Sequence, residues 1–271
     1  MTAFSDRFIS AGGIRTHFLE AGGGPDVVLL HSGEFGACAR LSWERVIPAL
    51  ARHFRVVAPD FVGYGESEKL FSFENMWDFR IRQIADFLHA LSISRAHFIG
   101  NSLGATMLLS VAAMDDVPWP LDRIVASGGG GTPPDNEARR TLIGYDGTPA
   151  AMQRAVDVLL NDQSLRASPE YLRRRQEEAL RPGAWECAAA ARFRAPWRTS
   201  SDMPAKPDYG RIRVPTLLIT GAQDRVRGAN FGRELQGEIP NSQLHTIPGA
   251  GHCPNIDTPD TFAEIVLAYL A

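Results

Sequence analysis

Gly100-Asn101-Ser102-Leu103-Gly104 is the stretch that decides the fold. It follows a short apolar run, His97–Ile99, and opens a helical run, Ala105–Ala113. A Gly-x-Ser-x-Gly pentapeptide between a strand and a helix is typical of a sharp turn that projects the serine hydroxyl, and its glycines avoid clashes with neighbouring backbone. The helix amino terminus behind this turn favours developing negative charge. We therefore predict that Ser102 is a nucleophile at the carboxyl edge of a sheet.

Short apolar runs bounded by Gly, Pro, Asp or Ser recur on both sides of this turn. Such runs suit strands that are buried on both faces of a mostly parallel sheet. They are Val27–Leu30, Arg55–Ala58, His97–Ile99, Ile124–Ala126, Thr216–Ile219 and Gln243–Ile247. Gly12-Gly13, between Phe4–Ser10 and Ile14–Glu20, predicts a hairpin at the start. Helical patterns lie between strands, as in Trp77–Leu91, so the fold class is α/β with right-handed crossovers.

From about Thr132 to Tyr209 strand patterns are missing from the sequence. Ala150–Leu160, Pro169–Leu180 and Ala184–Arg194 are helical patterns separated by Pro and Gly. We predict one sheet domain, residues 1–131 and 210–271, interrupted by a helical cap over residues 132–209. A final helix is expected near Pro259–Leu270.

The partners of a serine nucleophile follow in the order serine, acid, histidine. Asp224 comes just after the strand Thr216–Ile219, and His252 lies in a glycine-rich loop after Gln243–Ile247. A serine hydroxyl needs a histidine to take its proton, and the histidine needs a carboxylate to fix its tautomer. We predict that His252 is the general base and Asp224 its orienting acid, although an aspartate after a strand is also a common turn former.

Two backbone amides should form an oxyanion hole. One belongs to Leu103, directly after the nucleophile. The other is expected in His31–Gly36, a glycine-rich bend after the strand Val27–Leu30, where we favour Gly33. An ordinary turn is the alternative for this bend.

Composition limits the partners. The net charge of −3 and a pI near 6.2 give no reason to expect nucleic acid or an anionic membrane. The three cysteines, an odd number, have no metal-ligand spacing, so neither a metal nor a disulfide framework is expected. The amino terminus lacks the features of a signal peptide, and no apolar run is long enough to span a bilayer, so we expect a cytoplasmic protein.

With these residues in place, the chain resembles α/β-hydrolases over nearly its whole length, and most closely the meta-cleavage-product hydrolases. The narrower resemblance lies in His31–Ala37 with Trp43 and Ile47–Leu50, in Val57–Gly65, in Gly100–Gly104 and in Gly251-His252. It implies the α/β-hydrolase fold, a mostly parallel eight-stranded sheet flanked by helices, with the cap inserted. It also implies hydrolysis of a carbon–carbon bond in a vinylogous 1,5-diketone of the 2-hydroxy-6-oxohexa-2,4-dienoate type, formed by aromatic ring opening. Water is then the only other reactant, without cofactor or metal, and a homodimer is expected by analogy.

The same resemblance implies substrate-binding residues. Asn101, just before the nucleophile, and Arg175, on a cap helix, match residues that contact the substrate's carboxylate and dienol portion. Arg175 stands among three arginines, so a solvated helix face is the other reading. The chain departs from the family at Ser32, where glycine is usual, and at Cys253, where tryptophan commonly follows the histidine. Ser32 would alter the tightness of the oxyanion loop, and Cys253 would change one wall of the site.

Other readings stay open. Trp185, Phe193 and Trp197 would either line an apolar pocket under the cap or pack helices. A carboxylic-ester or lactone hydrolase would use the same triad without needing the arginine. A non-catalytic binding module of this fold would often have a broken triad, whereas this one is complete.

Overall fold

The sheet at the centre of the molecule follows from the buried apolar runs of the sequence. A computed structural model describes residues 4–193 and 207–271. Its strands are β1 (Ser5–Ala11), β2 (Ile14–Gly22), β3 (Asp26–Leu30), β4 (Arg55–Pro59), β5 (Ala96–Asn101), β6 (Leu121–Ser127), β7 (Thr216–Gly221) and β8 (Ser242–Ile247). They form one eight-stranded sheet in the order β1-β2-β4-β3-β5-β6-β7-β8. The first hairpin pairs Ala11 with Ile14, and β2 is antiparallel to β4, while β3 to β8 are parallel. The α/β-hydrolase fold is confirmed.

Helices cover both faces of this sheet, because neighbouring strand residues point to opposite sides. Val28 and Leu30 pack with α3 (Met76–Ala90), α4 (Leu103–Ala112) and α10 (Phe231–Glu238) in one apolar cluster. Val27 and Leu29 pack in the second cluster with α1 (Ala39–Trp43), α2 (Ile47–Leu50) and α12 (Pro259–Leu270). Short α11 (Pro254–Asp257) precedes α12, and a 3-10 turn, η2 (Tyr209–Arg211), precedes β7.

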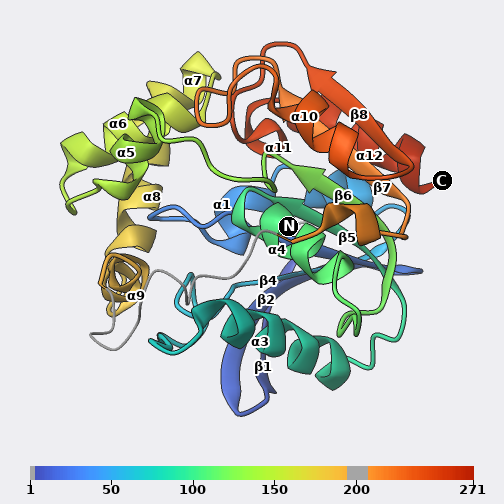
Figure 1. Ribbon diagram of the computed structural model, residues 1–271. Helices are drawn as coiled ribbons and strands as arrows, with labels where there is room; N and C mark the ends of the chain where they lie inside the picture. The colour runs from blue at the N-terminus through green and yellow to red at the C-terminus, as the bar shows by residue number, and fades with distance from the viewer. Residues whose placement is uncertain (1–3, 194–206) are drawn as a thin grey trace.

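Within residues 4–193 and 207–271, five helices stand apart from the sheet between β6 and β7. They are α5 (Glu137–Ile143), α6 (Pro149–Leu159), α7 (Gln163–Arg166), α8 (Pro169–Ala179) and α9 (Ala184–Ala190), and they gather on one side of the core (Figure 1). A third apolar cluster joins them to the loops at the carboxyl edge of the sheet, where it contains Phe35 and Cys253 together with Met152 and Tyr171. The helices therefore lie beside the edge at which the predicted catalytic residues emerge.

Candidate active site

The turn at Ser102 has the strained backbone that the pentapeptide predicts. Ser102 lies between β5 and α4 with φ 51° and ψ −106°, in a region that L-residues rarely adopt. A Cβ on Gly100 would lie 2.5 Å from the amide nitrogen of Ala105, and one on Gly104 would lie 2.3 Å from the carbonyl oxygen of Leu30. Only glycine fits at these two positions, so the sequence of the turn is dictated by its tight packing.

Three side chains meet in a hydrogen-bonded row at this turn. The Nε2 atom of His252 lies 2.9 Å from the Oγ atom of Ser102, and its Nδ1 atom lies 2.9 Å from Oδ2 of Asp224. The other carboxylate oxygen of Asp224 accepts the backbone N–H groups of Val226 and Arg227, at 2.8 and 2.9 Å. Burial alone would raise the pKa of Asp224, but the charge and hydrogen bond of His252 outweigh it and lower that pKa. Asp224 is therefore an ionised partner for the histidine.

A buried carboxylate that sequence reasoning missed holds the histidine loop. Asp257 accepts the N–H of Gly251 at 2.6 Å and those of Asn161 and Asp162 at 2.9 Å. The N–H of His252 itself donates to the carbonyl of Leu159, at the end of α6, at 2.8 Å. Helix α6 thus helps to place the imidazole over the serine.

The predicted oxyanion loop touches the turn directly. A Cβ on Gly33 would lie 2.8 Å from Cβ of Leu103, so the two residues whose amides we predict as donors are packed together. His31 fixes the loop: Nδ1 lies 2.6 Å from the carbonyl oxygen of Ser32, and Nε2 accepts the N–H of Phe61 at 3.0 Å. Burial lowers the pKa of His31, which agrees with a neutral ring that both donates and accepts.

Arg175 lies beside this loop rather than on a solvated face, since only 1% of its side chain is exposed. Its Nη2 atom donates to Oε1 of Glu34 at 2.8 Å and to the carbonyl oxygen of Phe35 at 3.3 Å, and Nη1 lies 3.3 Å from the hydroxyl of Tyr171. Ser32 donates to the same Oε1 atom at 3.0 Å. Glu34 was not singled out from the sequence. A lone acid in an otherwise neutral glycine-rich loop was the available signal.

The other predicted substrate-binding residues have different surroundings. Asn101 is fully buried beneath the histidine loop, where its Nδ2 atom donates to the carbonyls of Ser127 and His252, at 3.3 and 3.4 Å. Its Oδ1 atom has no partner in the described part of the chain. Cys253 is fully buried, and burial raises the pKa of its thiol well above the ordinary value. Trp197 lies outside the described residues.

Of the two remaining aromatic candidates, Phe193 is 68% exposed among the described residues. It follows α9, which ends at Ala190 before the expected boundary. Trp185 packs near Phe35, with ring centroids 6.5 Å apart.

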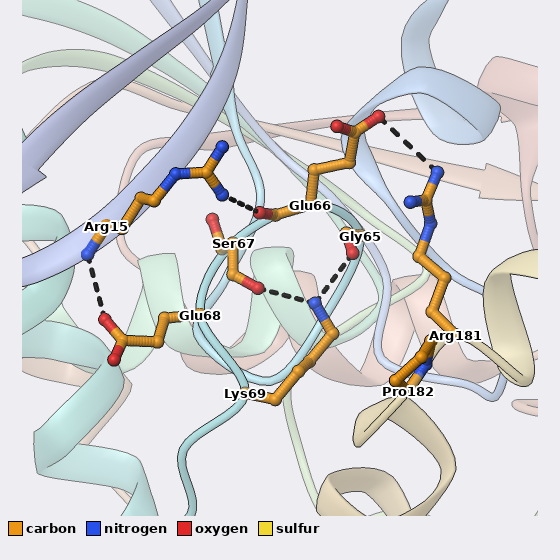
Figure 2. A pocket seen from close by; sticks show the side chains of 8 residues that line it. All are labelled: Arg15, Gly65, Glu66, Ser67, Glu68, Lys69, Arg181 and Pro182. Carbon is orange, nitrogen blue, oxygen red and sulfur yellow. Dashed lines mark hydrogen bonds and ion pairs between the residues drawn. The ribbon is translucent and has the colours of Figure 1, made fainter.

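A hollow of about 490 Å³ lies away from the triad, between a core loop and the end of α8. Its lining residues are Arg15, Gly65, Glu66, Ser67, Glu68, Lys69, Arg181 and Pro182 (Figure 2). Each cation in it already has hydrogen-bond partners: Nη1 of Arg15 donates to the carbonyl oxygen of Glu66 at 3.3 Å, Nζ of Lys69 donates to carbonyls of its own loop, and Arg181 pairs with Glu66. The three cations are therefore held by residues that themselves line the hollow.

Within residues 4–193 and 207–271, no group of three or more His, Cys, Asp or Glu side chains is arranged to hold a metal ion. The described helices are all too short or too polar to cross a membrane.

The strained serine, the imidazole and the buried carboxylate form the arrangement that serine hydrolases use. The chain belongs to the alpha/beta hydrolase family, whose sequence profile matches residues 27–265. It is 32% identical to 2-hydroxy-6-oxo-6-(2'-aminophenyl)hexa-2,4-dienoic acid hydrolase of Metapseudomonas resinovorans, over 100% of this chain and 92% of that protein. It is also 32% identical to 2-hydroxy-6-oxo-2,4-heptadienoate hydrolase of Pseudomonas putida, over 98% and 96%.

A solved structure agrees with these relatives. The meta-cleavage product hydrolase of Pseudomonas fluorescens, in a complex with acetates, superposes with a TM-score of 0.86 at 28% identity, covering 97% of each chain. The resemblance to meta-cleavage-product hydrolases is thereby confirmed.

Proposed function

We propose that this protein is a serine hydrolase that uses Ser102 as nucleophile, His252 as general base and general acid, and Asp224 as the carboxylate that orients the imidazole. The observation that carries the proposal is the unbroken row of two 2.9 Å hydrogen bonds that ends on a serine with φ 51°. In this role Nε2 takes the Oγ proton as the serine attacks a carbonyl carbon, and later returns a proton to the leaving group.

The backbone amides of Gly33 and Leu103 are the proposed oxyanion donors. Their packing against one another supports this assignment, because both N–H groups must reach one developing oxyanion. Losing one such donor costs about 2.7–4 kcal/mol in the transition state. The hydroxyl of Tyr64 donates to the carbonyl oxygen of Gly33 at 2.7 Å, and this hydrogen bond helps to fix the loop that contains Gly33.

The bond that we propose is cleaved is the carbon–carbon bond beside the remote ketone of a ring-fission product, a vinylogous 1,5-diketone. The whole-length similarity to two dienoate hydrolases supports this choice. After ketonisation of the enol, the acyl carbon receives OH from water and the departing carbon receives H, which gives a hydroxydienoate-type product and a carboxylic acid. Asn101, Arg175, Ser32 and Cys253 are the proposed contacts for the remainder of the substrate, and no cofactor is needed.

The test compares a coloured ring-fission dienoate with a p-nitrophenyl ester, in wild type and Ser102→Ala. Rapid bleaching of the dienoate, with little ester turnover and with loss of both activities in the variant, is the expected result. Full activity in Ser102→Ala would refute the proposal.

Ester or lactone hydrolysis is the second candidate, and one observation favours it. Arg175 is already paired with Glu34, so its charge is not free for the carboxylate of a dienoate. Ester turnover with negligible bleaching of the dienoate would select this alternative.

The division into a core of residues 1–131 and 210–271 and a cap of residues 132–209 is also proposed, supported by the five helices between β6 and β7. A cytoplasmic homodimer is the proposed state. Light scattering on the purified protein tests the dimer, and fractionation of cells tests the location.

A further inference from the structure

The loop that contains Gly33 is joined to α8 by one buried guanidinium. Arg175 donates from Nη2 to Oε1 of Glu34 at 2.8 Å and to the carbonyl oxygen of Phe35 at 3.3 Å. Only 1% of the Arg175 side chain and 6% of the Glu34 side chain are exposed. Burial alone would raise the pKa of Glu34, but the charge and hydrogen bond of Arg175 outweigh it and lower that pKa. The contact is therefore an ion pair that is shielded from water.

The backbones of the loop and of α8 also touch. Gly36 has φ 78°, and a Cβ on it would lie 2.4 Å from the carbonyl oxygen of Arg175. On the other side of the loop, the hydroxyl of Ser32 donates to the same Oε1 atom of Glu34 at 3.0 Å. The residues on both sides of Gly33 therefore contact Arg175 or the carboxylate that is paired with it.

Gly33, between these residues, carries the amide that we propose as an oxyanion donor. Its N–H belongs to the peptide group that joins it to Ser32, and the carbonyl oxygen of that group lies 2.6 Å from Nδ1 of His31. The next carbonyl, that of Gly33 itself, accepts the hydroxyl of Tyr64 at 2.7 Å. The carboxylate of Glu34 adds a third restraint, because through Ser32 and through its own backbone it acts on both sides of the Gly33 amide.

We propose that Arg175 is a positioning residue for the oxyanion hole: by holding the carboxylate of Glu34, it fixes the Gly33 amide where the oxyanion forms. The inference rests on the proposed function for the role of that amide. It requires no contact between Arg175 and the substrate. A displacement of about 1 Å in such a group can lower a rate about a hundredfold, so the docking of α8 on this loop controls the rate of attack by Ser102.

The test replaces both charged residues together, so that neither charge is left buried without its partner. The double variant Glu34→Gln with Arg175→Leu removes the hydrogen bonds from the arginine to the loop. Its readout is the rate constant for labelling by an uncharged alkyl fluorophosphonate, in which Oγ of Ser102 displaces fluoride from phosphorus and the phosphoryl oxygen occupies the oxyanion hole. We expect this rate constant to fall about tenfold or more.

The charge and the pH dependence of the reaction make this readout specific. A contact between Arg175 and the carboxylate of a dienoate would raise the KM for that substrate, but its loss could not slow an uncharged probe. The pH at which labelling reaches half of its maximum should stay that of wild type, because neither substitution touches His252 or Asp224. A lower rate with an unchanged midpoint therefore reports the oxyanion hole and not the triad.

Glu44→Gln with Arg174→Leu is the matched control. This neighbouring pair also joins α8 to the core, through hydrogen bonds of 2.8 and 2.7 Å, but it is part-exposed and Glu44 follows α1. Labelling should stay within about twofold of the wild-type rate. Where the variant of Glu34 and Arg175 does not fold, Ser32→Ala removes one hydroxyl and no charge, and should slow labelling about threefold or more.

Labelling of the folded double variant at the wild-type rate would overturn the inference, and so would an equal loss in the control or a shifted midpoint. An unchanged rate in Ser32→Ala would overturn it where the double variant does not fold. The proposed function is read separately, from wild type and Ser102→Ala. Equal labelling of these two proteins, or none of wild type, would refute the nucleophile and the inference with it. Labelling that needs Ser102 but not the pair would remove only the role of Arg175.

Discussion

Asp257 offers a sharp test of how the cap and the histidine loop are held together. Its carboxylate accepts backbone N–H groups from Gly251, which precedes His252, and from Asn161 and Asp162, which follow cap helix α6. In Asp257→Asn, either orientation of the amide turns an NH2 group toward at least one of these N–H donors. A buried donor left without a partner costs about 1–3 kcal/mol.

The expected loss of unfolding free energy is therefore about 1–3 kcal/mol. Burial raises the pKa of Asp257, so the neutral amide relieves a desolvation cost, and this relief shifts the loss toward the lower end of the range. In a chain of this size the loss corresponds to a fall in Tm of roughly 2–12 °C. Because the loop carries the general base, kcat should fall about tenfold or more while KM changes less.

Urea unfolding followed by circular dichroism measures the stability, and steady-state kinetics measure kcat. Asp260→Asn is the matched control, because Asp260 is exposed in the first turn of α12 and should change unfolding free energy by less than about 0.5 kcal/mol. Equal stability of the two variants would show that these hydrogen bonds do not hold the loop.

Asp224→Asn keeps an oxygen for the two backbone amides but turns an NH2 group toward the imidazole, so kcat should fall by about 10⁴-fold with an unchanged Tm; a loss below about tenfold would contradict the assigned role. The hydrogen bond and charge of Asp60 outweigh burial and raise the pKa of His17 above its ordinary 6.5. The stability that this pair contributes is therefore complete below pH 6.5 and is lost as the pH rises through the raised pKa of His17. Urea unfolding at a series of pH values should show this loss in wild type and not in His17→Gln. Gly104→Ala would place a Cβ 2.3 Å from the carbonyl oxygen of the last residue of β3 and should cost about 3 kcal/mol or more in unfolding free energy. Gly237→Ala, with nothing within 4 Å, should instead stabilise α10 by about 0.5–1 kcal/mol, and equal effects would refute the packing argument.

The sequence predicts the elements whose burial leaves a periodic pattern. β5 and β7 are buried along their whole length, and each was located from its apolar run. The hairpin of β1 and β2 was marked by its two glycines. In contrast, α5 and α7 have no buried residue, so neither carries an apolar stripe that the sequence could reveal. Their positions are set by packing against neighbouring helices and by N-cap residues such as Asn136, at the start of α5.

The candidate site divides in the same way. Ser102 and His252 lie in short motifs whose backbone conformation requires neighbouring glycines, and these glycines are visible in the sequence. The pair of Glu34 and Arg175 spans 141 positions and exists only because α8 docks on the oxyanion loop. Asp257 accepts hydrogen bonds from main-chain N–H groups. Every residue except proline has such a group, so the sequence does not indicate which of them Asp257 contacts. Contacts of this kind require the structure.

The three consecutive arginines of α8 show why residue type alone does not assign a role. Successive helical side chains point about 100° apart, so each arginine meets a different environment. Arg173 is 56% exposed and pairs within its own helix, Arg174 bridges to the core at Glu44, and Arg175 is buried against Glu34. The first pair is worth little in water, whereas breaking the buried pair by removing one partner costs about 3–5 kcal/mol. The carboxylate opposite each guanidinium therefore decides whether that arginine stays in solvent, fastens α8 to the core or is buried.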